Sequence, residues 1–204
     1  ISQIVVAFIL IVAILLIASC GPRPSGFIPA DAESTLILTS IPPDTSGSNA
    51  TNETQTTTPA SEVPLTFISD ADSYVDQAAP DTNFGKKSLM RVDSGNDMFE
   101  SFIRFNVTDS LGTIRKAVLR LYSASNGSSN GPAIYAISAP WAEDTITWNN
   151  RPSHSDAALD NKDQIVSDTW VEYDVTGAVT GKGVYSFVIV PDSGDAITFS
   201  THER

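Results

Sequence analysis

The chain has 204 residues, of which 24 are acidic and 12 are basic, so its formal net charge is −12. An acidic surface repels the phosphates of nucleic acids, which argues against DNA or RNA as a partner. The single cysteine, Cys20, excludes an internal disulfide and a zinc site built on several cysteines, and His154 and His202 lie too far apart in the sequence to predict a histidine-rich metal site.

Residues 4–17 form an unbroken apolar run. This run is shorter than the ~20 apolar residues of a typical membrane span and matches the ~7–15 of a secretory signal core. Ile17-Ala18-Ser19-Cys20 resembles a bacterial lipobox, in which the cysteine receives a lipid. Three interpretations of residues 1–20 stay open: a lipoprotein signal with lipidation at Cys20, an uncleaved membrane anchor, and an ordinary cleaved signal.

All three interpretations place the rest of the chain outside the cytoplasm, secreted or anchored at the cell surface. The membrane is then a partner through this segment or its lipid. The first residue is Ile1 rather than methionine and the sequence stops abruptly at Arg204, so we expect a piece of a longer product.

Residues 21–64 have the composition of a disordered linker. Residues 44–61 are almost entirely Ser, Thr, Asn, Gly, Gln, Pro and acidic residues. Such a segment cannot bury enough apolar surface to offset the entropy lost on ordering. Leu36-Ile37-Leu38 is an apolar exception that we expect to be too short to build a core. The linker would hold a domain away from the membrane.

Residues 65–204 alternate between short runs rich in Val, Ile, Phe, Tyr and Thr and clusters of turn residues. In the run 116–122, Ala117, Leu119 and Leu121 would face one way and the residues between them the other. The absence of a βαβ alternation and the spacing of the runs predict an all-β domain, a jelly-roll-like β-sandwich, with one short helical turn at residues 176–180. The predicted strands are 65–69, 73–76, 89–93, 100–106, 114–122, 133–137, 145–148, 169–174, 184–190 and 196–201.

Several pieces of this domain resemble, in order, the DNRLRE-type domain, also classified as carbohydrate-binding module family 96. The most specific piece is residues 141–152, with Trp141, Trp148 and Pro152; the ending Ser200-Thr201-His202-Glu203 departs from the usual Ser-Arg-Glu type. The resemblance implies a non-catalytic β-sandwich module of cell-surface or polysaccharide-degrading proteins, with acidic polysaccharides such as alginate among its ligands. The matching pieces are 72–76, 80–85, 89–92, 102–105, 114–122, 141–152, 173–176 and 199–203.

Candidate ligand-binding residues are of two kinds. Tryptophan rings stack on the apolar faces of sugars, but buried aromatics also fill sandwich cores. We expect Trp148 and Trp170, which lie in strand runs, to be core residues, whereas Trp141 at a loop edge fits either role. Basic groups offer partners for uronate carboxylates, the alternative being a solvated basic face. These basic residues are Lys86, Lys87 and Arg91 around one turn, and Arg115, Lys116 and Arg120 on one strand.

Hard oxygen ligands gather in two turns, which suggests structural Ca²⁺, although neither turn has the spacing of an EF-hand. Solvated turns are the alternative. The first set is Asp70, Asp72, Asp76, Asp81 and Asn83, and the second is Asp93, Asn96 and Asp97.

Arg104 lies between Ile103 and Phe105, so we expect it to pair with an internal carboxylate such as Glu143 or Glu203. Glu143 and Asp144 are adjacent and would point to opposite faces of a strand, so they cannot act as a catalytic pair. The sequence has no Gly-x-Ser-x-Gly, His-Glu-x-x-His or P-loop motif. We therefore expect a binding protein rather than an enzyme, the alternatives being a structural adhesion domain and a glycan-cleaving, disaggregatase-like fragment.

Overall fold

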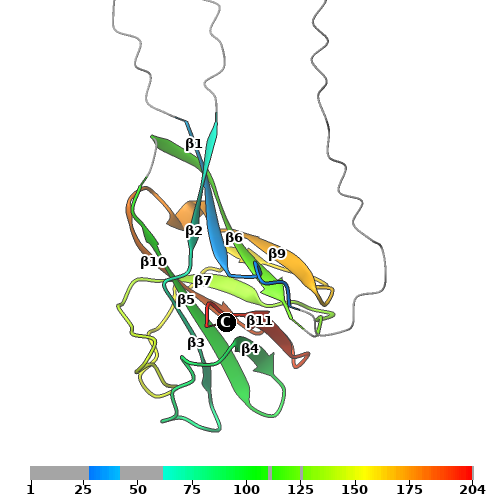
Figure 1. Ribbon diagram of the computed structural model, residues 1–204. Coiled ribbons are helices and arrows are strands. Elements are labelled where there is room, and N and C mark those ends of the chain that lie inside the picture. Colours follow the sequence, from blue (N-terminus) through cyan, green and yellow to red (C-terminus); the bar gives the residue numbers. More distant parts are fainter. Residues whose placement is uncertain (1–27, 42–61, 110–111, 125, 204) are drawn as a thin grey trace, which may run out of the picture.

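The computed structural model describes residues 28–41, 62–109, 112–124 and 126–203, and within them the fold is all-β (Figure 1). Every strand pair is antiparallel. The described part of the chain has no helix with the length and apolar character that crossing a bilayer requires. The strands are β1 (Thr35–Ile41), β2 (Val63–Ile68), β3 (Ala71–Asp76), β4 (Leu89–Ser94), β5 (Met98–Val107), β6 (Thr113–Ser123), β7 (Ala133–Ile137), β8 (Asp160–Asn161), β9 (Thr169–Asp174), β10 (Gly183–Val190) and β11 (Ile197–Ser200), with one 3₁₀ turn, η1 (Thr176–Ala178).

The strands form two layers joined by the β4–β5 hairpin. In the first sheet β1 lies between β2 and β6, β9 pairs with β6, and β11 links the end of β6 to β4. The second sheet has the order β3-β5-β10-β7-β8. Leu119 of the first sheet and Phe105 and Phe187 of the second belong to one buried cluster, so the two layers pack face to face, which confirms the predicted β-sandwich.

The core lies between the two sheets and follows from the alternation along each strand. On β6, Ala117, Leu119 and Leu121 are buried, while Val118 and Arg120 between them are half-buried and point outward, as the sequence predicts. Opposite them, β5 and β10 contribute Phe105 and Phe187, both fully buried. Full burial of one such side chain stabilises the fold by about 1.5–3 kcal/mol.

The prediction of a disordered linker over residues 21–64 is wrong for the segment that forms β1. Leu36 and Leu38 are fully buried, and they lie opposite Leu119 and Ala117 of β6. Figure 1 shows β1 between β2 and β6, so this short strand has hydrogen-bonding partners on both edges. Pairing on both sides supplies the burial that its few apolar residues could not provide alone. Residues 1–20, 21–27 and 42–61 lie outside the described residues.

The predicted strand at residues 145–148 is also wrong, because this segment is a series of turns. Side-chain amides replace the bonds of a sheet here. Asn150 donates to the carbonyl of Thr145 (2.8 Å) and accepts from the amide of Thr147 (2.7 Å), and Asn83 donates to the carbonyl of Ile146 (2.8 Å). The other predicted strands are confirmed with small differences at their ends, and the two-residue β8 was not predicted.

Candidate functional site

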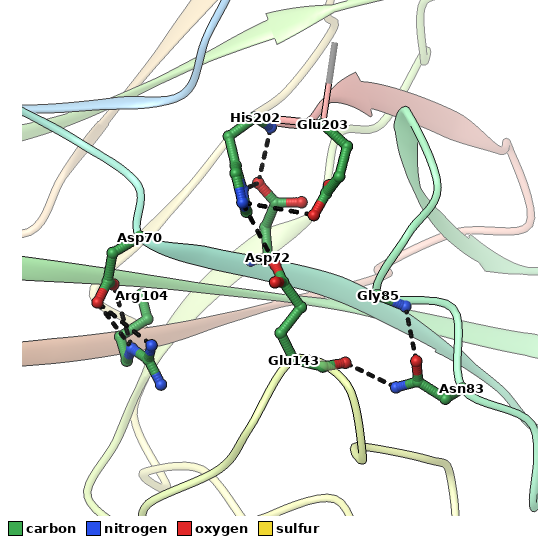
Figure 2. A network of polar contacts seen from close by, with 8 residues as sticks. All are labelled: Asp70, Asp72, Asn83, Gly85, Arg104, Glu143, His202 and Glu203. Carbon is green, nitrogen blue, oxygen red and sulfur yellow. Dashed lines mark hydrogen bonds and ion pairs between the residues drawn. The ribbon is translucent and has the colours of Figure 1, made fainter.

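One imidazole and three carboxylates lie together beside β3 (Figure 2). They are His202, Asp72, Glu143 and Glu203, and one nitrogen or oxygen atom of each lies within 4.8 Å of those of the others. Asp72 comes from β3, Glu143 from the loop after β7, and His202 and Glu203 from the segment after β11. The fold thus gathers three segments that are far apart in the sequence.

The sheet edge explains how this cluster is assembled. Asp72 pairs with Ile103 of β5, so its side chain points to the interior side of the second sheet, and its side chain has no solvent exposure. β3 pairs with β5. The backbone amide of Asp72 donates to a side chain rather than to that strand: its acceptor is Oε1 of Glu143, at 2.8 Å. Asp72 Oδ2 accepts from the backbone amide of His202 (3.0 Å) and contacts its ring Nδ1 (2.8 Å).

The other ring nitrogen of His202 faces the two glutamates. Its Nε2 lies 3.4 Å from Oε1 of Glu203 and 3.7 Å from Oε1 of Glu143. The side chains of His202, Glu143 and Glu203 are 27%, 27% and 22% exposed, so the cluster opens to solvent on this side only in part.

Burial and mutual repulsion dominate the electrostatics of the cluster. Burial raises the pKa of Asp72, against the hydrogen bonds from His202. Burial and the charges of Asp72 and Glu143 raise the pKa of Glu203 to about 7. Burial disfavours protonation of His202, but its hydrogen bond to Asp72 and the surrounding carboxylates outweigh this and raise its pKa. The cluster has an excess of negative charge, and its donor set can hold a metal ion.

A second feature is the loop of residues 138–154, which lies over the outer face of the second sheet. Ile146 is buried there against Phe102 and Val188. Trp141 packs edge-on against Phe102 with ring centres 6.0 Å apart, and the half-buried Trp148 packs against the same apolar cluster. The loop therefore has a small core of its own, outside the main one.

Three hollows border this loop, two of them larger than the third. The first, of about 410 Å³, is lined by Pro140, Trp141, Ala142, Thr145, Ile146 and Asn150. The second, of about 330 Å³, is lined in part by Glu100, Trp148, Arg151 and His154. Both combine aromatic or aliphatic surface with hydrogen-bonding groups.

Arg151 organises the second hollow. Its Nε lies 2.9 Å from Oε2 of Glu100, and its Nη1 donates to the carbonyl of Trp148 at 2.6 Å. Its guanidinium carbon lies 3.5 Å from the centre of the Trp148 ring. His154 packs on Tyr135 with ring centres 4.3 Å apart.

The predictions for the tryptophans need correction. Trp148 and Trp170 were expected in the core, and both are only half-buried: Trp148 packs on the small core beneath the loop, and Trp170 does not belong to the interior between the sheets. Trp170 lies on the outer face of the first sheet, edge-on to Tyr122 with ring centres 5.4 Å apart. Trp141, for which both roles were open, is also half-buried and lines the first hollow.

Arg104 has an acidic partner, but not one of those expected. It pairs with Asp70 at 3.1 Å and donates from Nη1 to the carbonyl of Trp141 at 3.1 Å. The amide of Asp70 donates to the carbonyl of Arg104, which brings the two side chains together (Figure 2). Glu143 and Glu203 instead face His202.

The five residues of the expected calcium site are not brought together as one ligand set. Within the described part of the chain, only Asp72 of these belongs to a group of acidic or histidine side chains close enough to share an ion. Asp76 accepts from the amide of Ala78, Asp81 from the side chain of Asn149, and Asn83 donates to the carbonyls of Glu143 and Ile146. In the second turn, Asp93 pairs with Arg91 at 2.7 Å.

The residues of the two basic groups are not among those that line the hollows beside the loop. Lys86, Lys87, Arg115 and Lys116 are exposed. Arg91 lies 3.9 Å from the centre of the Phe99 ring, and Arg120 pairs with Glu172 (3.0 Å) and lies over Trp170. Their role in binding stays a prediction.

The sequence analysis missed the grouping of Glu143, His202 and Glu203 with Asp72. One signal was available in the sequence: each of these residues lies in a segment that resembles the family. His202 also lies in the C-terminal segment, where this sequence departs from the family's usual Ser-Arg-Glu ending. Glu143 and Asp144 do point differently, since Glu143 is half-buried and Asp144 is exposed, but they lie in a turn rather than a strand.

Comparison with protein families gives one match. The sequence model of carbohydrate-binding module family 96 matches residues 63–204, which span β2 to β11 and leave β1 outside the match. None of the curated proteins compared matches the sequence significantly.

Proposed function

Because the chain belongs to carbohydrate-binding module family 96, we propose that it binds a polysaccharide in the hollows beside the loop of residues 138–154, without cleaving it. The observation that carries the proposal is the first hollow, where the half-buried ring of Trp141 lies beside the side chains of Thr145 and Asn150. Sugars present apolar C–H faces and hydroxyl groups, which match an aromatic ring next to hydrogen-bonding groups.

The loop is held in place before any ligand arrives. Asn150 and Asn83 bind its backbone, Arg104 binds the carbonyl of Trp141, and Ile146 anchors it on the sheet. Ordering a flexible loop on binding costs free energy, so a preformed surface favours affinity.

We further propose that the ligand is an acidic polysaccharide. Arg151 lines the second hollow, and Arg104 lines a third, smaller hollow next to Trp141; their side chains are 28% and 27% exposed. A guanidinium group binds a carboxylate through directed, paired hydrogen bonds, which suits the uronate units of alginate or pectin. The net charge of −12 opposes a polyanion at long range, so binding should depend on these local contacts.

Affinity electrophoresis and calorimetry on alginate, pectin, chondroitin and neutral glucans would test the proposal. We expect retardation by at least one acidic polysaccharide and, for Trp141→Ala, a loss of about tenfold, equivalent to about 1.4 kcal/mol. Trp170→Ala is the matched control, because Trp170 is also half-buried but lies on the outer face of the other sheet.

Equal loss in both variants would contradict the assignment of the binding surface. Absence of binding to every polysaccharide would favour an adhesion domain instead. Release of reducing ends would show a glycan-cleaving enzyme.

We also propose that the module is displayed outside the cell, tethered through the segment before β1. The support is the apolar run at residues 4–17 followed by Ile17-Ala18-Ser19-Cys20. Mass spectrometry of the full chain produced in a bacterial host should find a lipid on Cys20, and Cys20→Ser should abolish it. An unmodified Cys20 in a membrane-bound chain would favour the uncleaved anchor, and a cytoplasmic chain would contradict the proposal.

A further inference from the structure

We propose that Glu143, His202 and Glu203, oriented by Asp72, bind one divalent transition-metal ion of the class represented by Zn²⁺. The ion would tie the loop after β7 and the segment after β11 to β3. This site is separate from the hollows beside the loop and does not depend on the proposed glycan binding.

The spacing of the donor atoms suits such an ion. Bonds of roughly 2.0–2.2 Å place the ligand atoms of a tetrahedral zinc site roughly 3.3–3.6 Å apart. His202 Nε2 lies 3.4 Å from Glu203 Oε1 and 3.7 Å from Glu143 Oε1. The two distances from the imidazole nitrogen are therefore close to those of a zinc site, and the ligand atoms of the whole cluster lie within 4.8 Å of one another.

Asp72 orients the imidazole. Its Oδ2 lies 2.8 Å from His202 Nδ1, so in the tautomer with a proton on Nδ1 the lone pair of Nε2 is directed away from Asp72, on the side of the two glutamates. Metal-binding histidines in proteins commonly donate their other ring N–H to a carboxylate in this way, which fixes the tautomer and the ring orientation.

A buried oxygen without a partner is an independent sign of a ligand. The side chain of Asp72 has no solvent exposure, and its Oδ1 has no hydrogen-bond donor among the described residues. Figure 2 shows this oxygen turned toward Glu203, into the cluster. Buried polar atoms almost always have a partner in native proteins, because leaving one unpaired is costly. The ion itself would lie on the far side of the imidazole ring, but a water molecule in its fourth coordination position would supply a donor directed into the cluster.

Charge and donor type select the ion. Three carboxylates and one imidazole retain net negative charge even when the imidazole is protonated, so a divalent cation fits better than an ion pair alone. Ca²⁺ prefers six to eight oxygen ligands, whereas an imidazole nitrogen suits zinc and its neighbours. The donor set therefore favours a transition metal over calcium.

The scaffold around Glu143 is rigid, as a metal site requires. Asn83 donates to the carbonyl of Glu143 at 2.7 Å, and Gly85 packs so closely that an added Cβ would lie 2.2 Å from the same oxygen. The glutamate is thus positioned by contacts that do not involve the ion.

Calorimetry on the chelator-treated full chain would test the site with ZnCl₂, MnCl₂ and CaCl₂ as separate titrants. We expect one zinc ion per chain, weaker calcium binding, and a melting temperature that rises with zinc concentration. His202→Gln and Glu203→Gln should each weaken zinc binding by at least tenfold, the usual size of losing a ligand or its support.

Matched controls are Asp144→Asn, an exposed carboxylate next to Glu143, and His154→Gln, the other histidine. Both should bind zinc like the unmodified chain. Failure of the unmodified chain to bind one zinc ion, or full binding by His202→Gln, would overturn the proposal and leave a metal-free ion-pair cluster.

A spectroscopic measurement keeps the test decisive if a variant fails to fold. Co²⁺ added to the unmodified chain should give intense visible absorption bands, because a tetrahedral or five-coordinate site intensifies them. Absence of such bands, or bands identical to those of Co²⁺ in buffer, would overturn the proposal. That outcome would not bear on the separate proposal that the chain binds a polysaccharide.

Discussion

Glu100 shows how a charge is accommodated at the outer face of the second sheet. Its side chain is 9% exposed and pairs with Arg151, which in turn lies over Trp148. A charge taken out of water needs a partner, and removing that partner costs more than the pair itself contributes. Arg120 pairs with Glu172 in the first sheet, but the side chain of Glu172 is 58% exposed and keeps its hydration.

Arg151→Met should therefore destabilise the fold by about 1–3 kcal/mol, because it leaves Glu100 buried without its cation. Arg120→Met removes the same charge and should cost under about 1 kcal/mol, because its partner Glu172 is exposed and keeps its hydration without the arginine. Urea unfolding of both variants measures the difference. Equal effects would mean that Glu100 finds another donor or remains hydrated.

At the scale of the element, β1 is an integral strand of the sandwich. It is a seven-residue strand in which alternate residues are buried, and it lies between β2 and β6. Its two leucines, Leu36 and Leu38, are as fully buried as the aromatic residues of the core. The strand therefore belongs to the folded domain rather than to a tether.

Leu38→Ala should lower the free energy of unfolding by about 2–4 kcal/mol, through lost burial and the cavity left behind. Ile37→Ala on the same strand is the control, because Ile37 points to the outer face and is only half-buried. Its effect should be clearly smaller. Similar values for the two variants would place β1 outside the cooperative core.

The loop after β7 depends on one glycine of the segment between β3 and β4. A Cβ on Gly85 would lie 2.2 Å from the carbonyl oxygen of Glu143, so a side chain there must displace the loop. Gly177 in η1 has no atom within 4 Å of such a Cβ.

Gly85→Ala should destabilise the chain by about 1–3 kcal/mol through this overlap. Gly177→Ala should be neutral or stabilise it by up to about 1 kcal/mol, because the unfolded chain loses freedom. Thermal unfolding checks both. A neutral Gly85→Ala would mean that the loop moves away at little cost.

At the scale of the whole molecule, the folded unit begins at an earlier residue than the match to the family. The match begins at residue 63, whereas β1 lies before it and completes the first sheet. A fragment of residues 62–204 would lack the neighbour of both β2 and β6 and would expose the apolar surface that Leu36 and Leu38 cover.

The fragment of residues 62–204 should accordingly have a lower melting temperature than the fragment of residues 28–204, and a stronger tendency to associate through the unpaired edges. Calorimetry and size-exclusion chromatography on the two fragments measure these properties. Identical behaviour would show that β2 and β6 close the sheet by themselves.

The all-β class, most strand positions and the resemblance to carbohydrate-binding module family 96 could be predicted from the sequence alone. These follow from local information: the alternation on strands such as β6, the turn residues between them, and the residues of the loop around Trp141. β7 and β9 were predicted at their observed bounds for this reason.

Contacts between residues that are distant in the sequence became visible in the folded chain. β1 is stabilised by strands that follow it in the chain, so its own composition indicated a linker. Residues 145–148 have the composition of a strand, but the side chain of Asn150 binds the backbone of Thr145 and Thr147 in place of a neighbouring strand. Such side-chain hydrogen bonds leave no periodic pattern in the sequence, so the turn could not be predicted. His202 meets Asp72 across 130 residues, and the strand pairing that brings them together cannot be inferred from either neighbourhood alone.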